Sequence, residues 1–251
     1  MGLKITVFPA LTDNYGFLLR DEATGKTAVI DAPDANVIAH RIAGQGLHRL
    51  DYLLNTHWHP DHAGGNAALK LQYGCTIYGP PEVTREGPLD HVIAPGAVFM
   101  LGETKLDVMD LGGHTLGLIG WHDAAGHNAF IGDCLFTLGC GKLFEGTAEQ
   151  MWASILRIAA LPGDTRLYHA HEYTMVNLAF AESLGMSEAL AERGPTLRAM
   201  RERGEFTSPT TVAEELATNP FLVYPLREKG FEAQAAKFAE LRAAKDVFKA
   251  A

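Results

Sequence analysis

The chain has 251 residues, of which 47% are apolar and 20% are charged, so it can bury a hydrophobic core and is not of the disordered type. Its formal net charge of −9 disfavours binding to a nucleic-acid backbone, because that surface rewards dense lysine and arginine patches. No run of about 18 or more apolar residues is present, so we expect no segment that crosses a membrane. We interpret the three cysteines, Cys75, Cys134 and Cys140, as free thiols in a reducing compartment and expect a cytoplasmic location.

The first part of the chain alternates between strand-like and helix-like segments. Asp34 is expected to cap a helix that runs to about Ala43, and a second helix is expected from Ala67 to Tyr73. Apolar and β-branched runs predict the strands Leu3 to Phe8, Gly16 to Leu19, Thr27 to Asp31, Leu50 to Asn55, Thr76 to Tyr78 and Lys105 to Asp110. This alternation predicts an α/β fold with functional sites where strands end.

After about Glu172 the sequence changes character. From Met175 to Ala251 strand signals vanish, and alanine, leucine, glutamate and arginine recur at helical spacing. Thr211 and Glu214 are spaced as a capping box at the head of one such helix. We therefore predict one domain over residues 1–172 and an α-helical extension over residues 173–251.

The most informative segment follows the predicted strand that ends at Asn55. Four potential metal ligands, His57, His59, Asp61 and His62, fall within six positions there. Imidazole and carboxylate ligands suit zinc, iron or manganese, and so many ligands would crowd one tetrahedral ion. The alternative is a polar loop of solvated histidines.

Three later positions strengthen the metal interpretation. His114, Asp133 and His171 each lie just after an apolar, strand-like run. Taken singly, each could be a cap or a solvated loop residue, but their order after the first cluster favours a shared site. Cys134 follows Asp133 directly, and successive side chains of a strand face opposite ways, so we expect it to pack behind the site.

This order of motifs resembles the metallo-β-lactamase superfamily: His-x-His-x-Asp-His, then Gly-His-Thr, Gly-Asp and a last histidine. The resemblance implies an αββα sandwich with two metal ions. His57, His59 and His114 would hold the first ion. Asp61, His62 and His171 would hold the second, and Asp133 would bridge the two.

Within that superfamily the sequence resembles glyoxalase II, also called hydroxyacylglutathione hydrolase, over the whole chain. The matching segments are Asp13-Asn14-Tyr15, Gly132-Asp133-Cys134-Leu135-Phe136, Gly139-Cys140-Gly141-Lys142, Glu145-Gly146-Thr147, His171-Glu172-Tyr173-Thr174, Thr218-Asn219-Pro220-Phe221-Leu222 and Arg242-Ala243-Ala244-Lys245-Asp246. By this resemblance the extension and the Lys142 loop bind glutathione, and the implied substrate-binding positions are Lys142, Phe144, Tyr173, Arg242 and Lys245.

The sequence departs from the family pattern at several positions. Phe144 stands where tyrosine is common, and Val223 where arginine is common, so the details of glutathione affinity are open. His169 replaces a small residue and adds an imidazole, whereas Trp58 replaces a histidine that is not a ligand. Without the resemblance, Arg242 and Lys245 would be a basic pair on the solvated face of a helix.

The resemblance implies hydrolysis of S-acylglutathione thioesters, for example S-lactoylglutathione, by a hydroxide that bridges two divalent ions. Asp61 and Asp133 would be the catalytic carboxylates, and zinc is the first expectation for the ions, with iron or manganese as alternatives. We expect a monomer that acts on a small molecule, without nucleic-acid or membrane partners. Two alternatives remain open: a mononuclear iron persulfide dioxygenase of the same fold, and a catalytically silent metal-binding protein.

Overall fold

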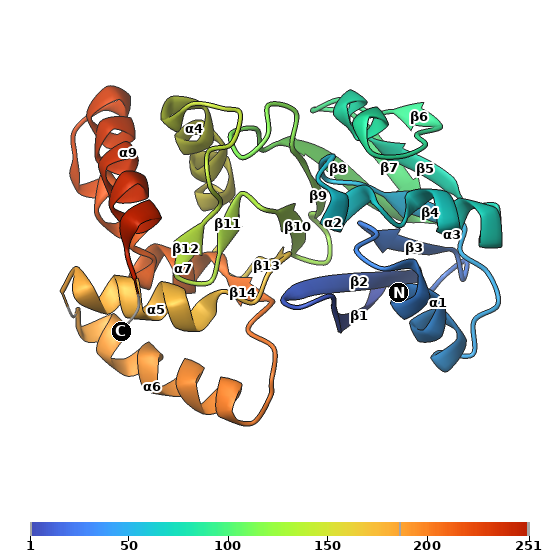
Figure 1. The fold of residues 1–251 in the computed structure, drawn as a ribbon, viewed down its shortest axis with the longest axis horizontal. Helices are drawn as coiled ribbons and strands as arrows, with labels where there is room; N and C mark the ends of the chain where they lie inside the picture. The colour runs from blue at the N-terminus through green and yellow to red at the C-terminus, as the bar shows by residue number, and fades with distance from the viewer. Residues whose placement is uncertain (1, 186, 250–251) are drawn as a thin grey trace. The chain divides into compact units, whose positions relative to one another are not determined.

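A computed structural model describes residues 2–185 and 187–249 (Figure 1). Met1, Met186, Ala250 and Ala251, which the predicted domain ranges include, lie outside the described residues. The described chain forms two compact units, one made of residues 2–110 and 117–132, the other of residues 111–116 and 133–249. These units do not coincide with the predicted domains, because residues 133–172 group with the helical extension.

The first unit begins with a mixed sheet. β1 and β2 form an antiparallel hairpin with β3 beside it, and β4, β5 and β6 continue the sheet in parallel. The helices α1, α2 and α3 lie in the connections that parallel strands require. The bounds are β1 Leu3–Ala10, β2 Asn14–Asp21, β3 Thr27–Ile30, α1 Ala35–Gly44, β4 Tyr52–Leu54, α2 Pro60–Ala63, α3 Asn66–Tyr73, β5 Thr76–Gly79 and β6 His91–Val92, with a 3₁₀ turn at Pro81–Arg85.

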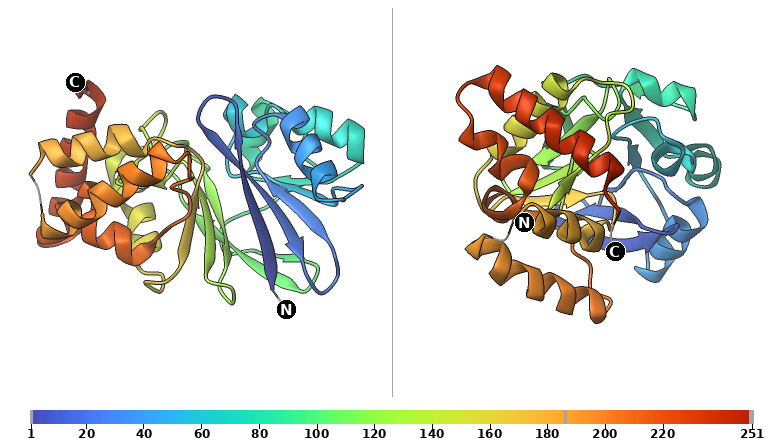
Figure 2. Two further views of the ribbon diagram at one scale, coloured as in Figure 1. Left: turned by 90° about the horizontal axis from the view of Figure 1, so that it is seen from below. Right: turned by 60° about the vertical axis from the view of Figure 1, so that its left-hand side comes forward.

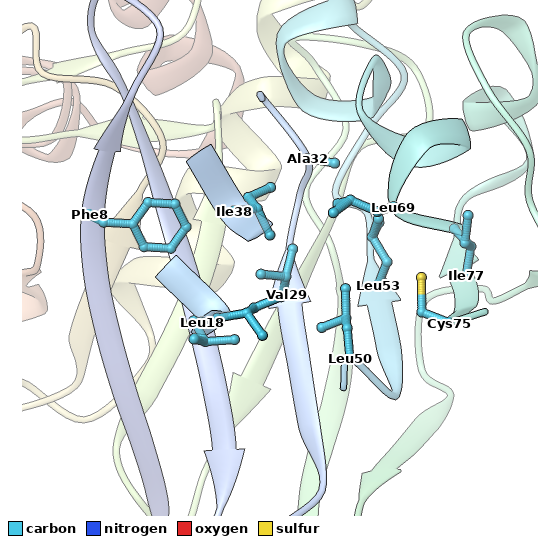
Figure 3. Packing of buried hydrophobic residues seen from close by; sticks show 11 residues of the cluster. Phe8, Leu18, Val29, Ala32, Ile38, Leu50, Leu53, Leu69, Cys75 and Ile77 are labelled. Carbon is cyan, nitrogen blue, oxygen red and sulfur yellow. The ribbon is translucent and has the colours of Figure 1, made fainter. Parts of the chain in front are cut away.

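The hydrophobic core of this unit lies between the sheet and two helices (Figure 3). Leu18, Val29 and Leu53 project from three neighbouring strands toward Ile38 of α1 and Leu69 of α3. Side chains alternate between the faces of a strand, so every second residue of these strands is committed to this core. The helices and strands around the core therefore fix where β4 ends, which is where the histidine cluster begins.

A four-stranded antiparallel meander completes the first unit. Its strands are β7 Val98–Leu101, β8 Thr104–Asp110, β9 Ile119–Asp123 and β10 Asn128–Gly132. Aromatic pairs join the meander to the mixed sheet, with ring centroids 5.6 Å apart for Phe17 and Phe130 and 5.1 Å apart for Tyr52 and Phe99. Such tilted and edge-on pairs are favourable beyond the area that they bury.

The second unit is mainly helical (Figure 2). It contains a short hairpin of β11 and β12, and an antiparallel pair of β13 and β14. The bounds are β11 Leu135–Phe136, β12 Gly139–Cys140, α4 Ala148–Ala159, β13 Arg166–His169, α5 Thr174–Ser183, α6 Glu188–Glu202, β14 Thr210–Thr211, α7 Val212–Thr218, α8 Pro220–Val223 and α9 Phe231–Val247, with a 3₁₀ turn at Pro225–Arg227.

Aromatic rings form the core between the helices of the second unit. Phe221 of α8 lies 5.9 Å from both Phe180 of α5 and Phe238 of α9, and Phe238 stacks on Trp152 of α4 at 6.0 Å. These rings are fully or almost fully buried. The C-terminal helices are therefore packed into the second unit through a shared aromatic core.

Most sequence predictions of local structure are confirmed. Asp34 caps α1 by accepting from the backbone nitrogens of Asn36 and Val37, and Thr211 and Glu214 form a reciprocal capping box at α7. The prediction that strands are absent after Met175 is wrong, because Thr210–Thr211 pairs with β13. All three cysteines are free thiols, as predicted, and all three are buried. No helix in the described part of the chain has the length and apolar character needed to cross a bilayer.

Candidate metal centre and substrate pocket

The first unit gathers four predicted ligands directly after β4. His57 Nε2 lies 3.1 Å from His59 Nδ1, and His62 Nε2 lies 3.4 Å from Asp61 Oδ2. Asp61 and His62 belong to α2, whose first residue, Pro60, has the fixed backbone angle that starts a helix readily. The short loop after β4 and the one-turn helix that follows it thus bring four side chains of one six-residue segment together.

A buried carboxylate holds the rings of this cluster in a defined tautomer. Asp31 accepts from His62 Nδ1 at 2.8 Å, from the Thr56 hydroxyl at 2.8 Å and from the Thr56 backbone nitrogen at 2.7 Å. Because the Thr56 hydroxyl donates to Asp31, His57 Nδ1 must donate to the Thr56 oxygen, which is 3.0 Å away. A proton of each ring is therefore on Nδ1, and Nε2 of His57 and of His62 is left to face a second partner.

Asn14, at the start of β2, holds the carboxylate of the cluster. Its side-chain amide donates to Asp61 Oδ2 at 2.9 Å and also approaches the Asp61 backbone oxygen at 3.4 Å. Asn14 is buried. The Asp-Asn-Tyr segment is thus more than a turn, because it orients a ligand 47 positions later in the chain.

The second unit gathers the other three predicted ligands. Asp133 Oδ2 lies 3.4 Å from His114 Nε2 and 3.3 Å from His171 Nε2, and all three residues are buried. His114 Nδ1 donates to the backbone oxygen of Lys142 at 2.9 Å, which again leaves Nε2 for a ligand. The ring of Tyr173 stacks on that of His171 with centroids 4.9 Å apart and planes within 2°.

These donor sets fit divalent transition-metal ions. In His57, His62 and His114, a protein acceptor binds one ring nitrogen, and the other nitrogen points at a second potential ligand. Metal-binding histidines have this arrangement, in which an outer partner fixes the tautomer and orients the ring. Three pairs of residues in the first unit have ligand atoms within 4.8 Å of each other. The pairs are His57 with His59, His57 with His62, and Asp61 with His62. A cation satisfies such closely spaced lone pairs and negative charge.

A pocket of about 470 Å³ lies in the second unit. It combines two of the predicted ligands with basic and aromatic side chains. The lining residues include all five predicted substrate-binding positions, and the full set is His114, Asp133, Phe136, Cys140, Gly141, Lys142, Phe144, Tyr173, Val176, Asn177, Arg242, Lys245, Asp246 and Phe248. Val223, by contrast, does not line this pocket and lies on α8.

The three basic residues of the pocket differ in how much of their bonding capacity is already used. Arg242 is 5% exposed and donates to the Cys140 backbone oxygen at 2.9 Å and to Asp246 at 3.0 Å. Lys245 donates to the Val176 backbone oxygen at 2.9 Å and is half-buried. Burial, with the charge of Arg242 nearby, lowers the pKa of Lys245 from 10.5 to about 8. Lys142 is exposed.

Gly141 and Phe144 shape the pocket near the ligands. A Cβ at Gly141 would lie 2.0 Å from the Asp133 backbone oxygen and 3.2 Å from His114 Nδ1, so only glycine fits there. Phe144 is 63% exposed, and its ring contacts that of His114 edge-on at 5.2 Å. The segment after Cys140 therefore passes close behind two ligands and presents Lys142 and Phe144 to the pocket.

Two residues of the second unit that the sequence singled out have other surroundings. His169 is fully buried: its Nε2 lies 2.9 Å from the Thr137 hydroxyl, and its Nδ1 lies 3.1 Å from the His171 backbone oxygen. Burial lowers its pKa. Cys134 is also fully buried and is not among the pocket-lining residues.

Sequence reasoning identified neither Asp31 nor Asn14 as a partner of the metal cluster. Neither position has a local sequence signal, because each acts on a ligand that lies 31 or 47 residues away. An isolated aspartate at a strand end and an asparagine in a turn are common for local reasons. Only the tertiary structure reveals their contacts.

Comparison with known proteins agrees with this chemistry. The sequence profile of the metallo-β-lactamase superfamily matches residues 14–171, so the chain belongs to that superfamily and has its fold. A second profile, described as the hydroxyacylglutathione hydrolase C-terminus, matches residues 172–248. The two matches meet at the position where the sequence predicts the start of the helical extension.

The chain belongs, more narrowly, to the hydroxyacylglutathione hydrolase (glyoxalase II) family. It is 43% identical to the hydroxyacylglutathione hydrolase of Erythrobacter litoralis, over 98% of this chain and 100% of that protein. It is 41% identical to the enzyme of the same name from Rhizobium meliloti, over 98% of this chain and 99% of that protein. These matches confirm the predicted family, including its helical C-terminal region.

Solved structures share the fold at lower identity. ETHE1 from Myxococcus xanthus superposes with a TM-score of 0.68 at 24% identity, covering 96% of this chain and 91% of its own. TTHA1623, whose structure was solved in a di-iron-bound form, superposes with a TM-score of 0.64 at 22% identity, covering 87% of this chain and 100% of its own. At these identities the likeness concerns the fold.

Proposed function

We propose that this protein hydrolyses S-acylglutathione thioesters, with S-lactoylglutathione as the reference substrate, at a centre that holds two divalent transition-metal ions. The observation that carries the proposal is the pocket of the second unit, in which two metal-type ligands, His114 and Asp133, line the same cavity as three basic side chains. Basic groups suit the carboxylates of glutathione, and metal-type ligands suit activation of water.

Seven side chains would hold the ions. His57, His59 and His114 are proposed for one ion, Asp61, His62 and His171 for the other, and Asp133 for both. Zinc is the first choice because its preferred ligands are histidine and carboxylate, and iron or manganese would accept the same set. When bound, the ions lower the pKa of a coordinated water to about 7, so that hydroxide is available at neutral pH.

The chain's own residues orient the nucleophile. Asp61 is held by Asn14, so its carboxylate is fixed in position before a substrate arrives. It is proposed to accept a hydrogen bond from the attacking water and to aim the oxygen lone pair at the thioester carbonyl. Because the carboxylate is already oriented, the attack loses less entropy when the reacting groups come together.

The leaving group explains why few other catalytic residues are needed. A thiol has a pKa near 8.5, so glutathione departs as a thiolate without a strong proton donor. An amide nitrogen would have to be protonated as it leaves. A site composed of metal ligands and binding residues is thus sufficient for a thioester.

The glutathione moiety is proposed to lie in the pocket of the second unit. Lys142 and Lys245 would bind its carboxylates directly, because both keep donors that the protein does not use fully. Arg242 would add positive charge from behind the pocket wall, since its guanidinium already binds Cys140 and Asp246. Tyr173 and Phe144 would pack against the apolar part of the ligand. Residues 173–251 then form the substrate-binding extension of a catalytic domain over residues 1–172.

The direct test is a steady-state assay of S-lactoylglutathione hydrolysis, with elemental analysis of the same sample. We expect thioester cleavage at neutral pH and its loss when chelators remove the metals. A metal-loaded sample that consumes oxygen with glutathione persulfide, but leaves the thioester intact, would favour the dioxygenase instead. A metal-loaded sample inactive on both substrates would indicate a binding protein.

We also propose a cytoplasmic location and a monomeric state. The three buried free thiols support a reducing compartment. Light scattering of the purified protein tests the monomer, and a mass near twice 27.2 kDa would contradict it.

A further inference from the structure

The hairpin of β11 and β12 is connected to all three ligands of the second unit. It starts two residues after Asp133, and its exit strand is tied back by a hydrogen bond from the Gly141 nitrogen to the Cys134 oxygen at 3.3 Å. The next residue, Lys142, supplies the backbone oxygen that orients His114. The two ligands Asp133 and His114 thus depend on the two ends of one hairpin.

The tip of the hairpin reaches the third ligand through His169. The His171 backbone oxygen can only accept, so the proton of His169 lies on Nδ1 and is donated over 3.1 Å. His169 Nε2 lies 2.9 Å from the Thr137 hydroxyl, which also donates to the Thr207 backbone oxygen at 3.1 Å. On the strand before Thr137, the ring of Phe136 packs edge-on against His171 at 5.9 Å.

Side chains of residues 173–251 hold this hairpin at each of its backbone positions from 136 to 140. Asn219 donates to the Phe136 and Gly139 oxygens at 3.1 and 3.0 Å, and Glu215 accepts from the Leu138 nitrogen at 2.9 Å. The remaining bonds run from Asn177 to the Thr137 oxygen at 3.1 Å and from Arg242 to the Cys140 oxygen at 2.9 Å.

Burial reinforces these bonds. Glu215 is 0% exposed and is paired with Arg193 at 2.7 Å, so its carboxylate is fixed rather than solvated. The Leu138 side chain at the hairpin tip is also fully buried, in a cluster with Leu178 of α5 and Leu190 of α6. A hairpin whose strands have only two residues each has marginal stability by itself, so its shape depends on these partners.

We propose that the C-terminal extension positions the three metal ligands of the second unit through this hairpin, with Asn219 and Glu215 as the principal positioning residues. The extension would then serve the metal centre as well as the substrate. This inference rests on the metal centre of the proposed function, but not on the identity of the substrate.

Asn219 offers the cleanest substitution. Its Oδ1 accepts from the Phe221 nitrogen at 3.0 Å and caps α8, and aspartate keeps that acceptor and the size of the side chain. Asn219→Asp removes the amide that donates to the Phe136 and Gly139 oxygens. It also places a second carboxylate where the amide now donates to Glu215 at 2.8 Å. The hairpin therefore loses its central support while the local helix cap remains.

The matched control is Asn128→Asp in the first unit. Asn128 is 1% exposed and its amide donates to Asp123 at 2.9 Å, so this variant makes the same chemical change beside a buried carboxylate. It does so in the first unit, at the start of β10 and seven residues before the hairpin, and its amide bond goes to Asp123 rather than to the hairpin. A general loss of stability should affect both variants.

The measurement is metal affinity without substrate, by competition with a chromophoric chelator, together with the thermal midpoint of each metal-free protein. Asn219→Asp is expected to lower the binding affinity for at least one ion by about ten-fold. This is the lower end of the loss seen when an outer partner of a metal ligand is removed. Asn128→Asp should keep wild-type affinity within about two-fold, because its amide shares no hydrogen-bond partner with the hairpin, although its midpoint falls.

Wild-type affinity in Asn219→Asp, or equal losses in the two variants, would overturn the inference. If Asn219→Asp does not fold, Asn219→Ser keeps a capping oxygen, is too short to reach the hairpin, and carries the same expectation. A wild-type protein that binds no transition metal would refute the proposed metal centre and this inference with it. A protein that binds metals but does not cleave thioesters would refute only the proposed activity.

Discussion

The carboxylate of Asp31 accepts a hydrogen bond from His62 Nδ1 over 2.8 Å, although the two residues are 31 positions apart. Asp31 leaves β3 with a backbone φ of 57°, a conformation that aspartate tolerates better than most side chains. Its carboxylate therefore fixes the ring that should present Nε2 to a metal.

Asp31→Asn should weaken metal binding. Thr56 and His62 both donate to the Asp31 carboxylate. An asparagine has one oxygen to accept these bonds, and its NH₂ group would face a donor instead of an acceptor. The expected loss of metal affinity is about 10- to 100-fold, as for other outer partners of metal-binding histidines. Chelator competition measures it. Asp34→Asn, which keeps a good cap on α1, is the control and should leave affinity unchanged.

Fully active protein should contain two transition-metal ions per chain. The expectation rests on seven candidate ligands, more than one tetrahedral ion accepts. Elemental analysis of protein purified without chelators, after dialysis against metal-free buffer, gives the ratio. Full activity at one ion per chain would contradict the dinuclear proposal.

Asp133→Ala should damage catalysis far more than Cys134→Ala. The first change removes a carboxylate within 3.4 Å of two histidines, so kcat should fall by at least about 100-fold, beyond the loss of an outer partner. The second change trims a buried thiol and should cost about 1 kcal/mol of stability with kcat almost unchanged. Comparable losses of kcat in two folded variants would mean that Cys134, not only Asp133, serves the reaction.

Substrate binding should depend on the charge of Lys245. Its pKa of about 8 means that the side chain is charged at pH 7 and loses its proton as the pH rises through 8. KM for S-lactoylglutathione should therefore rise between about pH 7 and 9. Lys245→Arg should remove that rise, because arginine stays charged. Lys245→Met should raise KM about ten-fold at pH 7, with little effect at pH 9. Parallel pH profiles for wild type and Lys245→Arg would exclude Lys245 as the source.

Arg242→Ala should change kcat as well as KM. A solvated contact residue would affect mainly KM, since binding to a remote part of a substrate is common to ground and transition states. Arg242 instead binds the Cys140 backbone inside the protein, so its loss should disturb the segment that leads to Lys142. We expect kcat/KM to fall about 10- to 100-fold, shared between both constants. Steady-state kinetics would contradict this if kcat stays at the wild-type value.

The sequence predicted the elements and ligands whose signals are local. Asp34 and the Thr211–Glu214 pair cap helices within four residues of themselves, and the His57–His62 cluster lies in one short segment. The family resemblance supplied the more distant residues, which the second unit gathers into one pocket.

The parts that could not be predicted depend on contacts made after folding. Thr210–Thr211 is too short for a strand signal and is defined only by its pairing with β13. Arg242 looks like part of a solvated helix face in the sequence but is 5% exposed in the structure. Neither the burial of a helix face nor the partner of a two-residue strand is encoded in local periodicity.

Gly141 limits how this protein could acquire a new substrate. Any side chain there would collide with the Asp133 backbone oxygen, so that position is closed to variation. Lys142 and Phe144 are exposed to the pocket and carry no such restriction. Substitutions at these two positions could alter which thiol carrier is accepted while the nearby ligands stay in place. Within this loop, Gly141 cannot be substituted without disturbing the metal ligands. Lys142 and Phe144 can be substituted, and such changes would alter substrate specificity.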